Sequence, residues 1–506
     1  MTTTEAPTTT ATARVSTLRP AHPRDALVVG GVGFLVAVAF SWIPSVWYDE
    51  AATVTGARRS LADLAVMLES VDVVHALYYL LMHGWFAVVG YTPFTLRLPS
   101  AIAAGVAVAL TMLLVQRIGS RRLAVISGLV LMVLPRFTWA GIEGRSFALG
   151  TAATVGLTLL LVVALDAQLS AHRDRRRTLI LWAAYAAVAA LSTVLFLYLA
   201  FVIAAHAVAV LAVAGRRVGR VVLPFGLAAA VAVAAALPAV SAAYDQSGQV
   251  GWIPPISDET WYSVFTTQFF PFAPLVAHLA WPLAAGGVIL LAVRMWRQRR
   301  GRRLLVLCVT LLVVPVVGVI LASEQLTPLY SPRYLTFTIP AFAILVAVLL
   351  DAIPWRPLLA AISALLLVAI APVFVEQHAP AAKDRSTWAP TADILDRESA
   401  QIDGDQAVVY GPVRRHPSAT GRIISTSYPD AFERLDDVTL EGPAVGLWEQ
   451  SLPLEASDVD GKSAVWLVTT DLADDEETRD VLADSGFVET ELWHLDYVRI
   501  FLFERP

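Results

Sequence analysis

The sequence contains very little cysteine and very little lysine. Among its 506 residues there is one cysteine, Cys308, and there are two lysines, Lys383 and Lys462. A single cysteine excludes a disulfide or a cysteine-based metal site within one chain. Because Cys308 lies inside an apolar run, we expect it to pack as a small buried hydrophobic residue. No histidine and carboxylate pair has metal-ligand spacing, so neither a metal site nor a cofactor is predicted.

Charged residues are also scarce. They make up 16% of the chain, whereas 57% of the residues are hydrophobic. Apolar runs of about 18 or more residues, which are typical of transmembrane helices, recur along the sequence. The composition therefore predicts an α-helical polytopic membrane protein. Eleven spans are predicted, at residues 26–44, 98–116, 123–138, 146–165, 178–194, 196–214, 221–240, 276–293, 304–322, 334–350 and 357–375.

A further apolar segment, HALYYLLMHGWFAVVG at 75–90, is shorter than the roughly 20 residues that a spanning helix needs. If this segment lies along the membrane surface, the loops on one side of the membrane carry 20 arginines and those on the other side carry six. The positive-inside rule then makes the arginine-rich side cytoplasmic. We therefore predict a juxtamembrane helix at 75–90 in a multi-pass plasma-membrane protein, with a cytoplasmic N-terminus and an extracytoplasmic C-terminus.

The charge distribution predicts three parts. Residues 1–25, rich in threonine, alanine and proline, are predicted to form a disordered cytoplasmic tail. Residues 26–375 are predicted to form the transmembrane domain, which includes a large outer loop at 45–97; residues 1–375 together carry 26 arginines and 15 acidic residues. Residues 376–506 carry 27 acidic and 11 basic residues and are predicted to form an extracytoplasmic domain. This part has no basic patch, so nucleic acid is not expected as a partner.

The acidic C-terminal part has the pattern of an α/β domain. Four segments rich in valine, isoleucine and aromatic residues are predicted as strands, and one charged segment is predicted as a helix. The strands are expected at 406–412, 422–428, 463–471 and 497–505, and the helix at 474–487.

The predicted outer loops contain three carboxylates that could do chemistry. Asp49 and Glu50 follow the first span in SWIPSVWYDEAAT, and Glu143 lies in the second outer loop. Carboxylates in these positions are candidates for a general base or for orienting an acceptor. Arg145 and Arg333 lie at the mouths of spans, where a lipid phosphate would lie, and a guanidinium fork suits a phosphate.

Simpler interpretations of these residues stay open at this point. Asp49 or Glu50 could cap a juxtamembrane helix that begins at Ala51. Arg145 and Arg333 could bind membrane lipid head groups. His75 opens the juxtamembrane helix and fits an active site or a membrane interface equally well.

Several short motifs, taken in their order along the chain, resemble those of the GT-C glycosyltransferases that use lipid-phosphate sugars. The most similar members are the protein O-mannosyltransferases and the lipid A aminoarabinose transferases. The resemblance covers most of 27–506, and the tail from Ser386 is similar to the extracytoplasmic domain of actinobacterial members. The motifs are YDE at 48–50, HALYY at 75–79, RLPS at 97–100, EGRSFAL at 143–149 and SPRYLTFTIPAF at 331–342. One departure is that the paired prolines that follow the family's histidine are missing after His75, which leaves the local conformation and acceptor specificity open.

The resemblance implies a reaction and roles for particular residues. Such enzymes move a sugar from a polyprenyl-phosphate carrier, usually with inversion and without a nucleotide, and the most similar members suggest no metal. Mannose and arabinose are the expected sugars, and the acceptor is expected to be a cell-envelope glycan, glycolipid or protein. The C-terminal domain would cover the catalytic cavity, help to bind the acceptor, or be purely structural. By this resemblance Asp49 is the catalytic base, Glu50 supports it, and Glu143 lies near the acceptor. The donor phosphate would be held by Arg145, Arg333 and Tyr334. The substrate would be bound by His75, Tyr78 and Arg97.

There are two alternatives to a transferase: a transporter or flippase for a lipid-linked glycan, and a non-catalytic scaffold for envelope assembly. Transporters place polar sites near the membrane midplane on broken helices, often in repeated halves. Here the predicted spans carry almost no charge, the polar motifs lie outside them and no internal repeat is visible. A membrane glycosyltransferase is therefore the predicted function, with the other two as alternatives.

Overall fold

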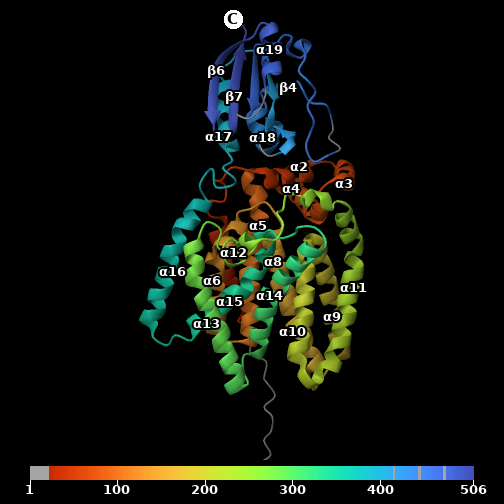
Figure 1. Cartoon of the computed structure of the whole chain (residues 1–506), viewed down its shortest axis with the longest axis vertical. Coiled ribbons are helices and arrows are strands. Elements are labelled where there is room, and N and C mark those ends of the chain that lie inside the picture. Colours follow the sequence, from red (N-terminus) through yellow and green to blue (C-terminus); the bar gives the residue numbers. More distant parts are fainter. Residues whose placement is uncertain (1–21, 414–415, 443–445, 471–474) are drawn as a thin grey trace, which may run out of the picture.

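A computed structural model gives the fold, and it describes residues 22–413, 416–442, 446–470 and 475–506. A bundle of long helices forms one end of the molecule and a mixed β-sheet forms the other, with short helices between them (Figure 1). The sequence predicts a disordered segment at 1–25, and residues 1–21 of this segment lie outside the described residues. Within the segment, Pro23 to Asp25 form the first turn of helix α1 (Pro23–Val38).

The bundle confirms a multi-pass membrane protein. Within the described ranges, nine helices are long and apolar enough to cross a membrane. The pair α6 and α7 makes a tenth span if it is counted as one bent helix, and α1, at 16 residues, is the remaining one of the eleven predicted. The nine are α5 (Pro93–Ile118), α8 (Phe147–Leu169), α9 (Arg175–Leu195), η2 with α10 (Leu197–Ala214), α11 (Val218–Asp245), α13 (Pro274–Gln298), α14 (Arg302–Gln325), η5 with α15 (Pro332–Asp351) and α16 (Arg356–Gln377).

The third predicted span is not one straight helix. Helices α6 (Arg121–Val133) and α7 (Pro135–Gly141) meet at an angle of 69°. Pro135 causes the break, because its ring has no N–H to donate and clashes with a continuing helix. The bend directs the chain into the loop that carries Glu143 and Arg145.

A layer of short helices crosses the end of the bundle that faces the sheet (Figure 1). Helix α4 has 14 residues and a length of about 21 Å, which is too short for a bilayer core of about 30 Å. The short helix predicted at 75–90 is therefore confirmed. The layer contains α2 (Tyr48–Arg58), α3 (Leu61–Ser70), η1 (Val73–His75) and α4 (Ala76–Val89), and the third outer loop adds η4 (Ser247–Val250) and α12 (Asp258–Phe265).

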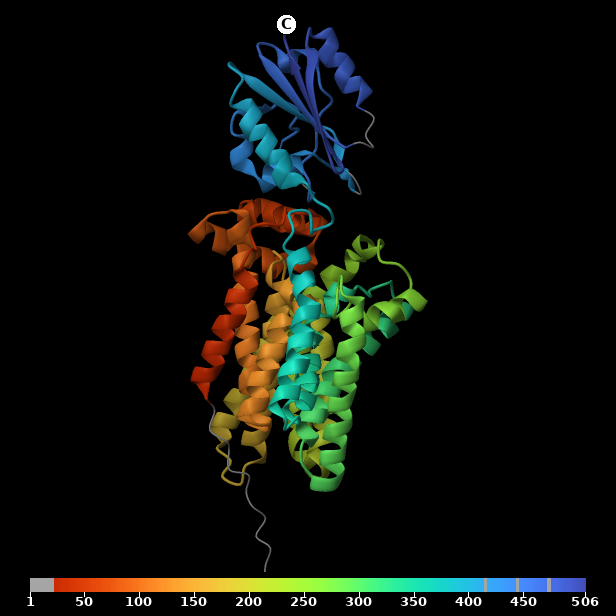
Figure 2. The same cartoon turned by 90° about the vertical axis from the view of Figure 1, so that its left-hand side faces the viewer.

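The arginine-rich loops lie at the opposite end of the bundle, far from the sheet (Figure 1). At this end Asp166 of α8 forms ion pairs with Arg117 and Arg303, and Asp25 forms one with Arg121. Helix α1 begins at this end and runs toward the layer of short helices (Figure 2).

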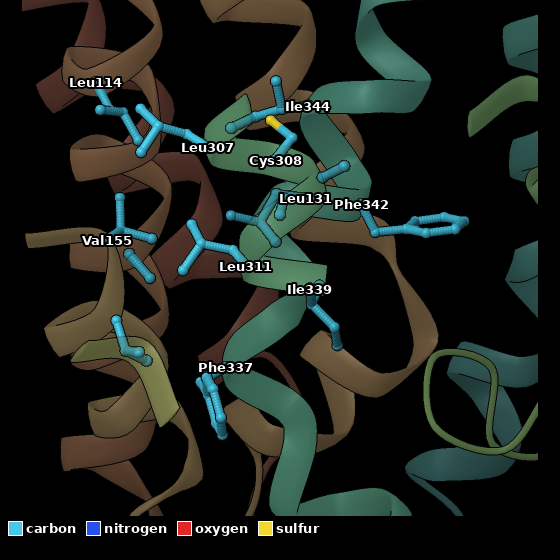
Figure 3. Packing of buried hydrophobic residues seen from close by; sticks show 14 of the residues in the cluster. Leu114, Leu131, Val155, Leu307, Cys308, Leu311, Phe337, Ile339, Phe342 and Ile344 are labelled. Atoms are coloured by element: carbon cyan, nitrogen blue, oxygen red, sulfur yellow. The ribbon is translucent and has the colours of Figure 1, made fainter. Parts of the chain in front are cut away.

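The bundle interior is apolar, and the single cysteine belongs to it. Cys308 is buried on α14 among leucine and isoleucine side chains of α14 and α15 (Figure 3). The prediction of a buried small hydrophobic residue is confirmed.

The C-terminal part contains a five-stranded sheet in the order β4-β1-β5-β7-β6. Strand β1 is parallel to β4 and β5, whereas β7 is antiparallel to β5 and β6. The strands of this sheet are β1 (Gln406–Tyr410), β4 (Leu435–Asp437), β5 (Ala464–Thr469), β6 (Val488–Leu495) and β7 (Val498–Glu504). A separate two-stranded sheet is formed by β2 (Pro412–Val413) and β3 (His416–Thr420). The helices of this part are α17 (Trp388–Ser399), α18 (Arg422–Ser427) and α19 (Glu476–Asp484).

Both faces of the central strands β1, β5 and β7 are covered, which explains why these strands are almost continuously apolar. Alternate side chains such as Val409 and Leu467 pack under α19. Their neighbours Val408 and Trp466 join a second cluster with α17 and α18. That second cluster continues into α2, α3 and α4, so the outer loop and the C-terminal part share one hydrophobic core.

One predicted strand is wrong. The strand predicted at 422–428 is instead helix α18 (Arg422–Ser427), in which Ile423 and Ile424 are both buried and Arg422 pairs with Asp437. A short apolar run does not distinguish strand from helix by its period, and here tertiary packing decides.

Candidate active site

The acidic pair opens helix α2. Asp49 and Glu50 lie in its first turn, where the helix dipole favours negative charge. The N-cap is Trp47, which makes no side-chain capping bond, so the capping interpretation is wrong. Successive residues of a helix point about 100° apart, and the two carboxylates therefore reach different surroundings.

Glu50 lies at the centre of a buried ionic cluster. Its carboxylate accepts hydrogen bonds from Arg97 (2.6 and 2.8 Å), from Lys383 Nζ (2.6 Å) and from the backbone N–H of Gly144 (2.8 Å). Burial alone would raise the pKa of Glu50, but Arg97 and Lys383 lower it to about 2. A Cβ on Gly144 would lie 2.6 Å from Leu96, so glycine allows this close approach. Glu50 is therefore ionised and fully engaged in holding the loops together.

The guanidinium group of Arg97 makes all of its hydrogen bonds inside the protein. The Arg97 side chain is fully buried, and besides Glu50 it donates to three backbone carbonyls of the segment between α1 and α2. These acceptors are the oxygens of Ser41, Pro44 and Ser45. This placement favours a positioning role for Arg97 over the predicted contact with substrate.

Lys383, which sequence reasoning did not select, completes the cluster. It lies in the linker between α16 and α17, is fully buried, and also donates to the carbonyl of Ile142 (2.5 Å). Burial and the nearby Arg97 lower its pKa. Its only sequence signal is that lysine is so rare in this chain.

Asp49 points instead to Arg333. The Asp49 carboxylate and the Arg333 guanidinium are 2.5 Å apart, and both side chains keep some exposure. The guanidinium lies over the rings of Trp47, Trp252 and Tyr334 at 5.4–5.6 Å. An arginine held by aromatic faces and one carboxylate is fixed in place with part of its fork still accessible.

Arg145 fixes the backbone beneath this pair. It donates to the carbonyl of Asp49 (3.0 Å) and to Nε2 of His75 (2.7 Å). A ring nitrogen that accepts from arginine is unprotonated, so His75 is neutral. Burial, Arg145 and Arg333 together lower the pKa of His75 well below its usual value. His75 thus orients Arg145.

Glu143 is buried without a partner. Neither of its carboxylate oxygens has a hydrogen bond, and the side chain is 0% exposed. Burial raises its pKa to about 7; Lys383 and Arg333 oppose this shift, and Asp49 and Glu50 add to it. An unpaired buried carboxyl group beside a charged site is a candidate for taking up or releasing a proton.

Two tyrosines of the predicted set lie in the walls. Tyr78 is buried in α4, and burial raises its pKa. Tyr334 packs its ring against Phe147, Phe196 and Tyr198 at centroid distances of 5.1–6.1 Å. Tyr79, which was not predicted, donates to Asp72 (2.6 Å) near Arg145.

The structure thus brings the predicted residues into one region where the outer loops meet. Asp49 and Arg333 form the accessible ion pair of this region. Glu50 and Arg97 form a buried ion pair that supports it. Among the described residues, no group of three or more histidine, cysteine or acidic side chains is placed to hold a metal ion.

No protein-family model and no curated protein sequence matches the chain. Solved structures do resemble it. ArnT from Cupriavidus metallidurans bound to undecaprenyl phosphate has a TM-score of 0.55 at 12% identity, over 96% of this chain and 98% of that one. The apo state of the same protein gives 0.53 at 14%, over 94% and 96%.

A third similar structure is the apo oligosaccharyltransferase of Archaeoglobus fulgidus. Its TM-score is 0.50 at 11% identity, over 88% of this chain and 69% of that one. These likenesses extend through both the helical bundle and the C-terminal part, and they confirm the fold expected from the sequence motifs. The chain has the fold of the GT-C membrane glycosyltransferases.

Proposed function

We propose that this protein is an integral-membrane glycosyltransferase. It moves a sugar, mannose or arabinose, from a polyprenyl-phosphate carrier to a glycan, glycolipid or protein of the cell envelope. The observation that carries the proposal is the Asp49–Arg333 pair at the outer end of a GT-C bundle, with Arg145 fixing the Asp49 backbone. The reaction takes place on the extracytoplasmic face, where no nucleotide sugar is available.

The geometry supports a division of labour between the two charged side chains. The acceptor hydroxyl oxygen attacks the anomeric carbon as its proton passes to Asp49, and the bond from that carbon to the phosphate oxygen breaks. The electron pair stays on the leaving polyprenyl phosphate, whose growing charge Arg333 stabilises. Attack from the face opposite the phosphate inverts the anomeric carbon.

The same ion pair suggests an order of events. Without substrate, Arg333 neutralises Asp49. A donor phosphate competes for the guanidinium fork and frees the Asp49 carboxylate to accept a proton. Arg145, which the sequence motifs assign to the phosphate, instead holds the Asp49 backbone and His75, and Tyr334 adds a donor on the phosphate side. Glu143 lies near the reacting groups as a second proton acceptor. His75 and Tyr78 shape the wall toward the acceptor.

The test is a transfer assay with purified protein in lipid, labelled polyprenyl-phosphate mannose or arabinose, and an envelope extract as acceptor. We expect Asp49→Asn to abolish transfer. Asp63→Asn is the matched control, because Asp63 lies in the same outer loop but is exposed and bonds only to Ser60.

Transfer by the wild type and by Asp63→Asn alone would support the proposal. Normal transfer by Asp49→Asn would remove the base assignment. Movement of the lipid-linked sugar across the membrane without a covalent product would identify a transporter. The absence of transfer from every lipid donor, together with normal envelope assembly by Asp49→Asn and Arg333→Gln cells, would favour a scaffold.

A further inference from the structure

A second polar cleft lies where helix α2 meets the C-terminal part. Its volume is about 280 Å³, and it lies between α2 and α18, which face each other at this junction (Figure 1). The lining residues come from both parts of the molecule: Thr55, Arg58, Arg59, Ala419, Thr420, Arg422, Ile423, Thr426, Trp448 and Glu449.

Hydrogen bonds hold the two walls of this cleft together. Arg58 at the end of α2 donates to the carbonyl of Thr426, and Arg59 donates to the carbonyls of Gly446 and Leu447. The cleft is thus formed by the native docking of the C-terminal part on the outer loop.

Two polar atoms of residues that line the cleft are buried and have no hydrogen-bond partner among the described residues. They are one terminal nitrogen of Arg59 (Nη1) and the hydroxyl of Thr420. A buried donor without a partner costs roughly 1–3 kcal/mol, and more if it is charged, so such groups generally serve a ligand or water. Both atoms belong to side chains that line the same cavity.

The cleft carries more positive than negative charge. Three arginines line it beside one acid, Glu449, and within the described ranges Arg422 alone of the three makes a salt bridge, with Asp437. Arg59 also lies close enough to Glu449 and Asp63 for both carboxylates to act on its charge. A positive cleft at this junction suits an anionic group, because guanidinium forks bind carboxylate or phosphate well.

The remaining lining suits a sugar ring. Trp448 contributes a large aromatic surface, and aromatic faces carry negative charge that attracts the C–H edges of a saccharide. Thr55, Thr420 and Glu449 supply hydrogen-bonding groups for hydroxyls.

The cleft and the reaction site lie at the two ends of one helix. Asp49 lies in the first turn of α2 and Arg58 at its last residue, a separation of about 14 Å along the helix axis. Because successive helical residues point about 100° apart, Arg58 faces the side of α2 opposite Asp49, so the cleft would hold a part of the acceptor that is distant from its reacting hydroxyl.

From these observations we propose that the cleft binds an acidic saccharide, the acceptor glycan, and so gives the C-terminal part a role in acceptor recognition. This inference rests on the transferase function proposed above. The anionic group sits on Arg58 and Arg59, and the sugar ring lies on Trp448.

The binding test uses the full-length protein in lipid nanodiscs and three probes. These are trigalacturonate, which carries carboxylates, glucose 6-phosphate, which carries a phosphate, and maltotriose, which is neutral. We expect one or both anionic probes to bind and maltotriose not to bind, and the better anionic probe identifies the acidic group. Arg59→Gln should weaken the binding of the anionic probe roughly tenfold or more, because this variant loses a charge-assisted hydrogen bond to the probe.

Three variants guard against a folding artefact. Arg58→Gln removes an exposed side chain of the cleft, and Trp448→Ala removes the aromatic surface, so both should also weaken binding. Arg434→Gln is the control, since Arg434 is an exposed arginine of the same domain that pairs with Asp396 outside the cleft. Equal binding of maltotriose, no binding of any probe, or binding unchanged in all three cleft variants would overturn the inference.

A transfer arm separates this inference from the proposed function. Asp49→Asn should lose transfer and still bind the anionic probe. The cleft variants should raise KM for the acceptor with little change in kcat, a split that general misfolding does not give. Transfer without saccharide binding in the cleft would overturn only the inference, whereas saccharide binding without any transfer would overturn only the proposed function.

Discussion

Arg333 is the cation of the site that a donor phosphate can reach. Its side chain is 20% exposed, whereas Arg97 has no exposed atom and Arg145 is spent on Asp49 and His75. We expect Arg333→Gln to lower the turnover of transfer by roughly 10²–10³-fold, the usual cost of losing one group that stabilises a developing oxyanion. Steady-state transfer measured against the polyprenyl-phosphate donor tests this.

Arg333→Lys should retain more activity than Arg333→Gln, since it keeps the positive charge but loses the planar fork. Arg173→Gln is the control, because Arg173 is an exposed arginine at the opposite end of the bundle. Turnover of Arg333→Gln within a factor of two of the wild type would show that another group carries the phosphate charge.

The raised pKa of Glu143 predicts how the free energy of unfolding changes with pH. Its pKa in the folded protein is raised to about 7, so the folded state holds this proton more tightly than the unfolded state does. The stabilisation is complete below the ordinary glutamate pKa and is lost as pH rises through 7. The loss is roughly 3 kcal/mol for a shift of this size.

We therefore expect Glu143→Gln, which stays neutral, to match the wild type near pH 5 and to be more stable at pH 8.5. Thermal unfolding of the purified protein in detergent at the two pH values measures this difference. A Tm difference that does not grow between pH 5 and 8.5 would contradict a raised pKa for Glu143.

At the scale of elements, the linker between α16 and α17 inserts Lys383 under the start of α2. Lys383 bonds to Glu50, the neighbour of Asp49, so the linker and the C-terminal part that follows it help to position the reaction site. Removing one partner of a buried ionic cluster typically costs roughly 3–5 kcal/mol. We expect Lys383→Met to destabilise the protein by about this amount and to lower kcat.

The matched control is Lys462→Met, which removes the only other lysine. Lys462 pairs with the exposed Asp436 on the surface of the C-terminal part, where an ion pair is worth little. Thermal unfolding and transfer should therefore change much less. The double variant Glu50→Gln/Lys383→Met should be less impaired than the sum of its single changes, and full additivity would argue against the coupling.

The elements also show where sequence reasoning succeeds. Apolar length predicts the spans, because a bilayer sets the length of each, and length together with the uneven arginine distribution predicts the short helix at 75–90. It does not predict the bend at Pro135 within 123–138 or the helical conformation of 422–428, which depend on a local break and on tertiary packing. The sheet strand Val488–Leu495 was missed because six of its eight residues are exposed and half of the eight are polar.

The site shows the same limit. The outer-loop motifs indicate Asp49, Glu143, Arg145 and Arg333 because each stands out as a charge beside an apolar span. The distinction between Asp49, which faces Arg333, and Glu50, which is buried with Arg97, needs the three-dimensional course of α2. Lys383 comes from a linker 333 residues away from Glu50, and no local pattern connects them.

At the scale of the whole molecule, the proposed reaction requires one orientation in the membrane. Loops rich in arginine lie at one end of the bundle, and the reaction site and the sheet lie at the other. The positive-inside rule predicts that the arginine-rich end is cytoplasmic and that the sheet lies outside. Because the only cysteine, Cys308, is buried, single introduced cysteines can report this orientation.

We expect a membrane-impermeant maleimide to label Ala483→Cys on intact cells and to label Ala171→Cys only after permeabilisation. Ala483 is exposed on α19 beside the sheet, and Ala171 is exposed in the loop between α8 and α9 at the opposite end, so the two variants make the same change at the two ends. The wild type, with Cys308 alone, sets the background. The reverse labelling pattern would place Asp49 and Arg333 in the cytoplasm, where nucleotide-activated sugars are available, and would remove the argument for a lipid-linked donor.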